Sequence, residues 1–179
     1  MRNPSIRFMT HTALCTALMA ILAPISIPGL VPISLATLVI YLCASVVGWK
    51  KATLAVALYI LLGAIGLPIY AEFSAGFDKL VGPTGGYFLG YLLIALSTGF
   101  AVERFHNRPV YTVIGMLIGT AACYLVGTLY LAHVQQMGFL PAAAVGVLPF
   151  LVGDAIKIAA AATLGYLLRS RLMKAGLLE

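Results

Sequence analysis

Long apolar runs alternate with short polar or turn-rich links along the whole chain. Six runs of 15 to 24 residues fit this description, near residues 8–26, 31–48, 52–66, 86–102, 109–132 and 149–168. A helix rises about 1.5 Å per residue, so roughly 20 apolar residues cross the hydrocarbon core of a bilayer. The pattern therefore predicts an all-α membrane protein with six transmembrane helices.

The composition places this bundle in lipid rather than in water. Of the 179 residues, 62% are hydrophobic and 9% are charged, against about 25% charged residues in a soluble domain. A soluble domain of this length leaves roughly 30% of its surface exposed, and the few polar residues here could not cover that surface. We expect a single transmembrane domain over residues 1–179, passing several times through the cytoplasmic membrane and surrounded by lipid.

The basic residues orient the predicted helices. The net charge is +6, but the positive charges are scattered between the apolar runs and form no single face, so we expect no nucleic-acid partner. Nine of them fall on one side of the predicted membrane: Arg2, Arg7, Lys50, Lys51, Arg104, Arg108, Arg169, Arg171 and Lys174. The links on the other side contain one basic residue, Lys79. Because positive charges favour the cytoplasmic side, both termini are expected in the cytoplasm and the number of spans is even.

Two charged residues, Asp154 and Lys157, interrupt the last apolar run. Each charge at membrane depth costs roughly 2.5–3.5 kcal/mol, and such residues usually face a bundle interior or a solute path. At a spacing of three residues both side chains lie on one helix face and can touch. Pro149 suits the first turn of a helix, which places the pair toward the outer end. Three roles remain open: a solute site, a buried ion pair that joins helices, or a proton relay.

Two outward links differ from the short inner ones. The link at 24–32 contains three prolines, one glycine and no charge, which predicts a stiff apolar flap. The link at 66–86 is long enough to be a lid or a binding loop. It ends in Gly-Pro-Thr-Gly-Gly-Tyr at residues 82–87. Backbone N–H groups there could hold a partly negative ligand at a helix N-terminus, and close packing at an ordinary helix start is the alternative.

The sequence argues against enzymatic chemistry and against a bound metal or cofactor. Cys15, Cys43 and Cys123 lie inside apolar runs without a paired spacing, and the three histidines are far apart. The apolar runs hold no nucleophile and base at helical spacing. The chain also lacks the phosphate-binding Gly-x-x-x-x-Gly-Lys-Ser/Thr loop. We therefore expect neither an enzyme nor an ATPase.

Three segments share their residues and their order with one known family. They read LGAIGLPIYA from Leu62, GPTGGYFLGY from Gly82 and PFLVGDAIK from Pro149. Together they resemble the BioY family, the biotin-specific substrate-binding (S) components of energy-coupling factor (ECF) transporters. The resemblance implies a six-helix S-component bundle and an outward-opening biotin pocket, with a lid formed by the two outward links. It also implies partners, namely a membrane coupling subunit and a pair of ATPases.

The resemblance assigns substrate-binding roles residue by residue. The matching positions of the last helix and of the loop motif are Asp154, Lys157, Gly82, Thr84, Gly85, Gly86 and Tyr87. Where relatives often have Pro-x-Thr-x-Gln, this chain has Ser34, which keeps a hydroxyl, and Ala36, which lacks the amide. Glu72 and Phe73 stand where relatives tend to have small or amide residues, and we include both in the expected site.

Biotin suits these residues chemically. The carboxylate of Asp154 can accept hydrogen bonds from the ureido N–H groups, while Lys157 donates to the ureido carbonyl or holds the carboxylate in place. Tyr41, Phe73 and Tyr87 could supply apolar walls for the thioether ring and the valeryl chain.

The carboxylate at the end of the biotin tail has three candidate partners. These are Lys79, the backbone N–H groups of the glycine loop, and water near the pocket mouth. The sequence does not choose among them.

The first helix offers a docking surface for the coupling subunit. Ala13 and Ala17 form a small-x-x-x-small face that allows close helix approach, with ordinary internal packing as the alternative. Two rival functions also remain: an S component for another vitamin, and a small proton-coupled carrier.

Overall fold

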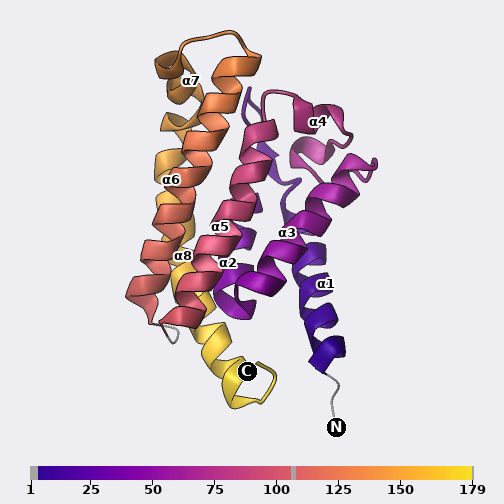
Figure 1. Ribbon diagram of the computed structural model, residues 1–179, viewed down its shortest axis with the longest axis vertical. Helices are drawn as coiled ribbons and strands as arrows, with labels where there is room; N and C mark the ends of the chain where they lie inside the picture. Colours follow the sequence, from indigo (N-terminus) through magenta and orange to yellow (C-terminus); the bar gives the residue numbers. More distant parts are fainter. Residues whose placement is uncertain (1–3, 106–107, 179) are drawn as a thin grey trace.

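Six long helices run back and forth along one axis, and each corresponds to one predicted apolar run (Figure 1). The computed structural model describes residues 4–105 and 108–178. The helices are α1 (Pro4–Leu22), α2 (Ala36–Val47), α3 (Trp49–Ala64), α5 (Gly85–Arg104), α6 (Pro109–Val134) and α8 (Leu148–Lys174). The start of α1 and the end of α8 lie at the same end of the bundle. The predicted helical fold class is confirmed.

Three of these helices have the length and apolar composition needed to cross a membrane. They are α5, α6 and α8, with 20, 26 and 27 residues. Apolar but shorter stretches occur in α1, over Ile6–Leu22, and in α2. Since α2 has 12 residues, it is only about 18 Å long.

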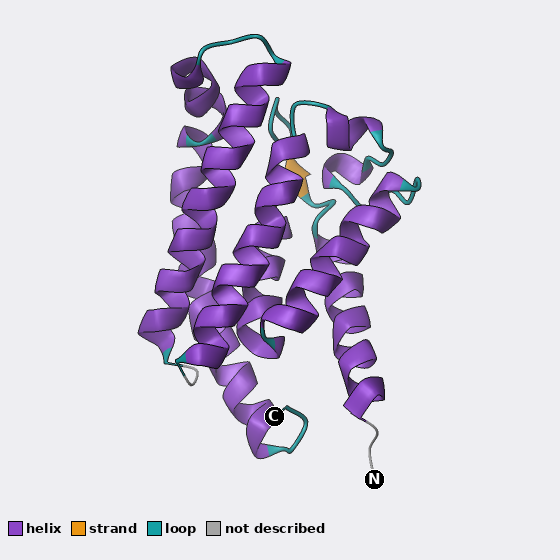
Figure 2. Ribbon diagram, in the orientation of Figure 1, coloured by secondary structure: helices purple, strands orange, loops and turns teal. Residues whose placement is uncertain are grey.

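The beginning of α2 differs from the prediction. The apolar run at 31–48 suggested one continuous helix, but α2 starts only at Ala36. Ahead of it, β2 (Ile33–Ser34) pairs antiparallel with β1 (Ser26–Ile27), the small ribbon drawn as strands in Figure 2. Pro32 accounts for the missing helix at Val31, because a proline disfavours the helical conformation of the residue before it, and the strand pairing of Ile33 and Ser34 delays the helix further. The helix therefore begins five residues later than the predicted run, while the chain remains mostly helical.

Two further helix ends also differ from the prediction. The run at 52–66 becomes a helix that already begins at Trp49, directly after Gly48, because this glycine reverses the chain with a φ of 84°. Lys50 and Lys51 therefore belong to the first turn of α3 and not to a link. The run at 8–26 ends as a helix at Leu22, just before Pro24.

Short helices cover the end of the bundle opposite the termini (Figure 1). The long outward link contains η1 (Ala71–Phe73) and α4 (Asp78–Val81), and α7 (Phe139–Gly146) lies between α6 and α8. We did not predict α7, since eight apolar residues are too few to show a helical period. The outward link is consequently a folded cap and not an extended loop.

Close packing between α5 and α6 depends on glycines in both helices. A Cβ atom at Gly90 would lie 2.4 Å from Sγ of Cys123, and one at Gly119 would lie 2.8 Å from Cα of Ile94. No side chain larger than hydrogen fits at such distances. The seam therefore uses small residues to bring two helix backbones together, as membrane helices often do.

Candidate functional site

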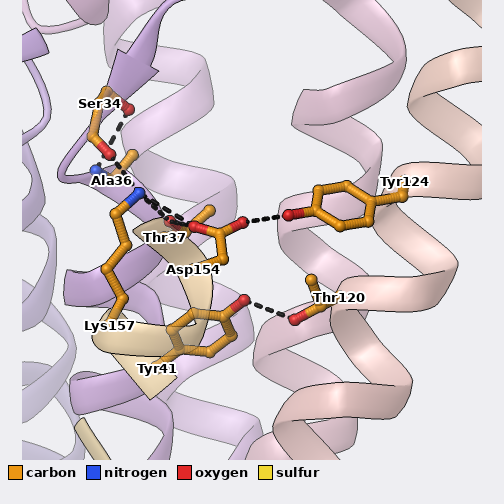
Figure 3. Close-up of polar contacts among 8 residues, drawn as sticks. All are labelled: Ser34, Ala36, Thr37, Tyr41, Thr120, Tyr124, Asp154 and Lys157. Carbon is orange, nitrogen blue, oxygen red and sulfur yellow. Dashed lines mark hydrogen bonds and ion pairs between the residues drawn. The ribbon is translucent and has the colours of Figure 1, made fainter. Parts of the chain in front are cut away.

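Asp154 is the centre of a buried polar network between three helices. It lies in the second turn of α8, and only 4% of its surface is exposed. Its Oδ1 accepts hydrogen bonds from Lys157 Nζ at 3.0 Å and from Thr37 Oγ1 at 3.2 Å. Its Oδ2 accepts one from the Tyr124 hydroxyl at 2.6 Å. Figure 3 shows the carboxylate between Lys157 and Thr37 on one side and Tyr124 on the other.

Lys157 uses all three of its donors within the protein. Besides Asp154, its Nζ donates to the backbone carbonyl of Ser34 at 2.8 Å and to Thr37 Oγ1 at 3.0 Å, and an ammonium has three N–H groups. The Ser34 carbonyl is available because α2 starts only at Ala36. Irregular backbone at membrane depth is tolerated where it lines a cavity or meets polar partners. The late start of α2 thus supplies part of the site.

The network compensates two charges that would be costly to bury alone. Removing one member of a buried ion pair typically destabilises a protein by about 3–5 kcal/mol, because the other charge stays buried and unpaired. The side chains of Lys157 and Asp154 are 11% and 6% exposed. Because both side chains are largely buried, the hydrogen bonds from Thr37 and Tyr124 to Asp154, and from Lys157 to Ser34 and Thr37, help to stabilise the two charges.

Two adjoining cavities lead from this network to the capped end of the bundle. A small cavity of about 30 Å³ touches Asp154 and Lys157, and a larger one of about 450 Å³ lies next to it. Five residues line both: Val31, Pro32, Ser34, Tyr87 and Tyr91. The larger volume lies within the ~300–1,000 Å³ typical of pockets for small organic ligands. The polar pair thus lines the small cavity, which shares a wall with the larger one.

Aromatic side chains form one wall of the larger cavity. The rings of Tyr59, Tyr70, Phe88 and Tyr91 follow one another with centroid distances of 5.6, 4.6 and 5.7 Å. The Tyr70 hydroxyl donates to the carbonyl of Ile60, and burial raises the pKa of Tyr70 to about 12. The phenol therefore stays protonated at neutral pH and keeps its donor. This wall offers an apolar surface to a ring-shaped ligand.

The two outward links meet at the mouth of the larger cavity. The N–H of Glu72 bonds both to the carbonyl of Pro24 at 3.1 Å and to Ser26 Oγ at 2.9 Å. Glu72 and Phe73 have φ angles of 60° and 53°, a left-handed conformation that is unfavourable for non-glycine residues. The bonds to the first link hold this turn in place.

Six of the residues predicted from the sequence line the two cavities. Asp154 and Lys157 line the small cavity, and Glu72, Gly82 and Thr84 line the larger one. Tyr87 lines both, and its hydroxyl donates to the carbonyl of Gly146 at 3.0 Å.

Two predicted glycines have a packing role instead. A Cβ atom at Gly85 would lie 1.9 Å from the carbonyl oxygen of Leu80, and one at Gly86 would lie 2.5 Å from Cβ of Tyr130. Neither glycine is among the residues that line the two cavities. Close packing at a helix start, the alternative weighed from the sequence, describes these two positions.

Two aromatic residues that we expected in the cavity wall, Tyr41 and Phe73, do not line either cavity. Tyr41 is fully buried, and its hydroxyl shares a 2.5 Å hydrogen bond with Thr120. Phe73 is 69% exposed. In place of these residues, Tyr59, Tyr70, Phe88 and Tyr91 form the wall.

Sequence reasoning missed Thr37 and Tyr124, which bond directly to Asp154. A hydroxyl is a weak signal in an apolar run, since threonine and tyrosine are also common where nothing binds. Among the described residues, no three potential metal ligands come together. His106 and Arg2, both considered from the sequence, lie outside the described residues.

Comparison with known proteins gives matches along almost the whole chain. The sequence model of the BioY family matches residues 1–174. The biotin transporter BioY of Thermotoga maritima is 38% identical over 165 residues, which cover 92% of this chain and 96% of that protein. The biotin transporter BioY2 of Lactococcus lactis is 32% identical over 158 residues, with coverage of 88% and 87%.

One solved structure has the same fold. It is the crystal structure of the S-component for biotin from an ECF-type ABC transporter, with a TM-score of 0.86 and 27% sequence identity. The alignment covers 95% of this chain and 95% of that chain. The similarity therefore includes the six long helices and the cap.

Proposed function

This chain belongs to the BioY family, and we propose that it captures biotin outside the cell for uptake across the cytoplasmic membrane. In this proposal the chain is the S component of an ATP-driven ECF transporter and catalyses no reaction itself. Its relatives are named biotin transporters, and the structurally similar protein is an S-component for biotin, which supports the substrate. The observation that carries the proposal is the Asp154 network, which lines the small cavity next to the larger one.

Biotin would meet the network with its ureido ring. The ring has two N–H donors and one carbonyl acceptor, and Asp154 Oδ2 keeps a lone pair free beside its single bond from Tyr124. The three donors of Lys157 are already engaged. For Lys157 to donate to the ureido carbonyl, it must give up one of these bonds. The acceptor released by Lys157, either Thr37 Oγ1 or the Ser34 carbonyl, could then accept a hydrogen bond from the ligand. The site therefore favours a polar ring over a purely apolar group.

The rest of biotin would extend through the larger cavity. The thioether ring and the valeryl chain are apolar, and the wall of Tyr59, Tyr70, Phe88 and Tyr91 matches them. The small cavity, at about 30 Å³, holds only one or two water molecules. The small cavity must therefore widen when the ureido ring binds. We expect the movement at Ser34, Tyr87 and Tyr91, which line both cavities.

We propose that the single domain crosses the membrane six times with both termini in the cytoplasm. The predicted inner residues that the structure describes support this, since Lys50, Arg104 and Arg108 adjoin the turns at the end where α8 finishes. The cavity mouth with Glu72 and Lys79 is at the opposite end. Helix α2 is too short to cross alone, and the β1–β2 ribbon before it would complete that crossing inside the protein.

We also propose that α1 docks on the coupling subunit through Ala13 and Ala17. Both alanines are exposed, whereas Thr12, Cys15 and Thr16 face the bundle. Their exposure supports a surface role over internal packing, the alternative left open by the sequence. An ATPase pair bound to the coupling subunit would supply the energy.

Uptake in living cells tests the proposed function against its rivals. Cells that cannot make or import biotin should grow on low biotin when they produce this chain with its coupling subunits. Unlabelled biotin should compete with uptake of labelled biotin, and thiamine or riboflavin should not. Competition by another vitamin would indicate a different S component. Uptake that persists without the ATPases and collapses with the proton gradient would indicate a proton-coupled carrier.

A further inference from the structure

Three charged side chains at the mouth of the larger cavity have no partner among the residues that the structure describes. Glu72, Asp78 and Lys79 all line this cavity and are exposed. In the part of the chain that the structure describes, none of the three side chains takes part in an ion pair or a hydrogen bond. The mouth thus presents two carboxylates and one ammonium to a ligand.

The backbone holds these charges in place. Glu72 lies in the left-handed turn whose N–H is bonded to Pro24 and Ser26. Asp78 and Lys79 are the first two residues of α4, and Thr84 Oγ1 bonds back to the carbonyl of Lys79 at 3.2 Å. The folded cap therefore fixes where the backbone of these three residues lies at the mouth.

This charge pattern does not match the tail of free biotin well. The tail ends in one carboxylate, which would meet Lys79 but also two like charges, and like charges at such range repel. A head group with both an ammonium and a carboxylate would offer an opposite charge to each of these side chains. Its ammonium would face Glu72 and Asp78, and its carboxylate would face Lys79.

We infer that the protein also binds biotin amides whose head is a zwitterionic amino acid, of which biotinyl-lysine is the simplest. This inference rests on the proposed function, because the ureido ring must still reach Asp154. The cavity of about 450 Å³ runs from Ser34 and Tyr91 to the charged mouth. When the ureido ring of a biotin amide is at Asp154, its acyl tail would extend through this cavity. The amide and the amino-acid head would then lie near Glu72, Asp78 and Lys79.

Equilibrium binding to the purified full chain tests the inference with four probes. They share the biotin ring and differ in the head: biotin is anionic, biotin methyl amide is neutral, biotinyl-cadaverine is cationic and biotinyl-lysine is zwitterionic. We expect biotinyl-lysine to bind at least as tightly as biotin and at least threefold more tightly than the neutral amide. Raising the salt concentration should shrink this preference, since exposed charges are screened.

Variants assign the preference to the mouth. The double variant Glu72→Gln with Asp78→Asn should weaken biotinyl-lysine at least fivefold more than it weakens biotin. Glu103→Gln removes a carboxylate at the opposite end of the bundle and should leave the ratio of the two affinities unchanged.

The outcomes separate this inference from the proposed function. If biotin binds and biotinyl-lysine binds more weakly than the neutral amide, the inference is wrong and the proposed function stands. Equal losses for both probes in the double variant would also overturn the inference. If a folded chain binds none of the four probes, the proposed function itself is wrong.

Discussion

The Tyr124 hydroxyl on α6 donates a 2.6 Å hydrogen bond to Oδ2 of Asp154 on α8. The other carboxylate oxygen is held by Thr37 from α2 and by Lys157. Three helices that are distant in sequence are thus joined at one buried charge. The charge also lines the small cavity, so a ligand there would lie beside side chains of α2, α6 and α8.

Tyr124→Phe should weaken biotin binding about three- to tenfold without unfolding the protein. The change removes one hydrogen bond to a charged acceptor, a contact worth about 1.5–3 kcal/mol, and part of that value is recovered by water or the ligand. Biotin titration of the purified variant measures the loss. Tyr166→Phe on the exposed face of α8 is the matched control and should bind as wild type. Equal affinity in both variants would remove Tyr124 from the site.

Gly63→Ala should destabilise the cap by about 1–3 kcal/mol, the usual cost of overpacking. Its Cβ would lie 2.2 Å from Cε1 of Tyr70, so the ring would have to move and lose its bond to the Ile60 carbonyl. Thermal unfolding in detergent checks this. Gly153→Ala is the control, because nothing lies within 4 Å of its Cβ position and alanine favours a helix interior. A Gly63 variant as stable as the control would contradict the packing described for Tyr70.

The sequence pointed to the centre of the candidate site more clearly than to its surroundings. Asp154 and Lys157 were recognisable because a charge in an apolar run is costly and therefore rare. Thr37 and Tyr124 gave no comparable signal, since a hydroxyl can be satisfied by its own helix. Their role depends on how α2 and α6 pack beside α8, which is a property of the fold and not of either segment.

The helix boundaries show a similar division. Hydropathy located all six long helices, yet it could not separate the ribbon at Ile33–Ser34 from α2, because both are apolar. Pro32 was the local signal for that break. Gly85 and Gly86 were assigned to the ligand, but a glycine that admits a ligand and one that admits a neighbouring helix look identical in sequence. The structure distinguishes them by the atoms around each.

Cysteine labelling should place the cavity mouth outside the cell. Phe77 lies at the capped end and is 65% exposed. We would introduce Phe77→Cys in a cysteine-free background. We expect an impermeant maleimide to label it in intact cells. Lys50→Cys, at the other end, should react only after permeabilisation. The reverse pattern would show that the proposed orientation is wrong.

Replacing Ala13 and Ala17 by leucine should impair docking without affecting capture. Both residues are exposed on α1, away from the cavities, so biotin binding to the isolated chain should be unchanged. Co-purification with the coupling subunits and biotin uptake should both fall several-fold. Ala155→Leu with Ala159→Leu has the same spacing on an exposed face of α8 and should keep both. Full uptake by the α1 variant would mean that the docking surface is on another helix.

The most direct test of the central claim is equilibrium binding of radiolabelled biotin to the purified chain and to Asp154→Asn, measured side by side. The wild-type chain should bind biotin saturably, and the variant should bind at least tenfold more weakly, a loss of about 1.4 kcal/mol. Thermal unfolding of both proteins separates this loss from misfolding, because Lys157 would keep an unpaired charge in the variant. A folded Asp154→Asn that binds biotin as tightly as the wild type would contradict the assignment of this network as the biotin site.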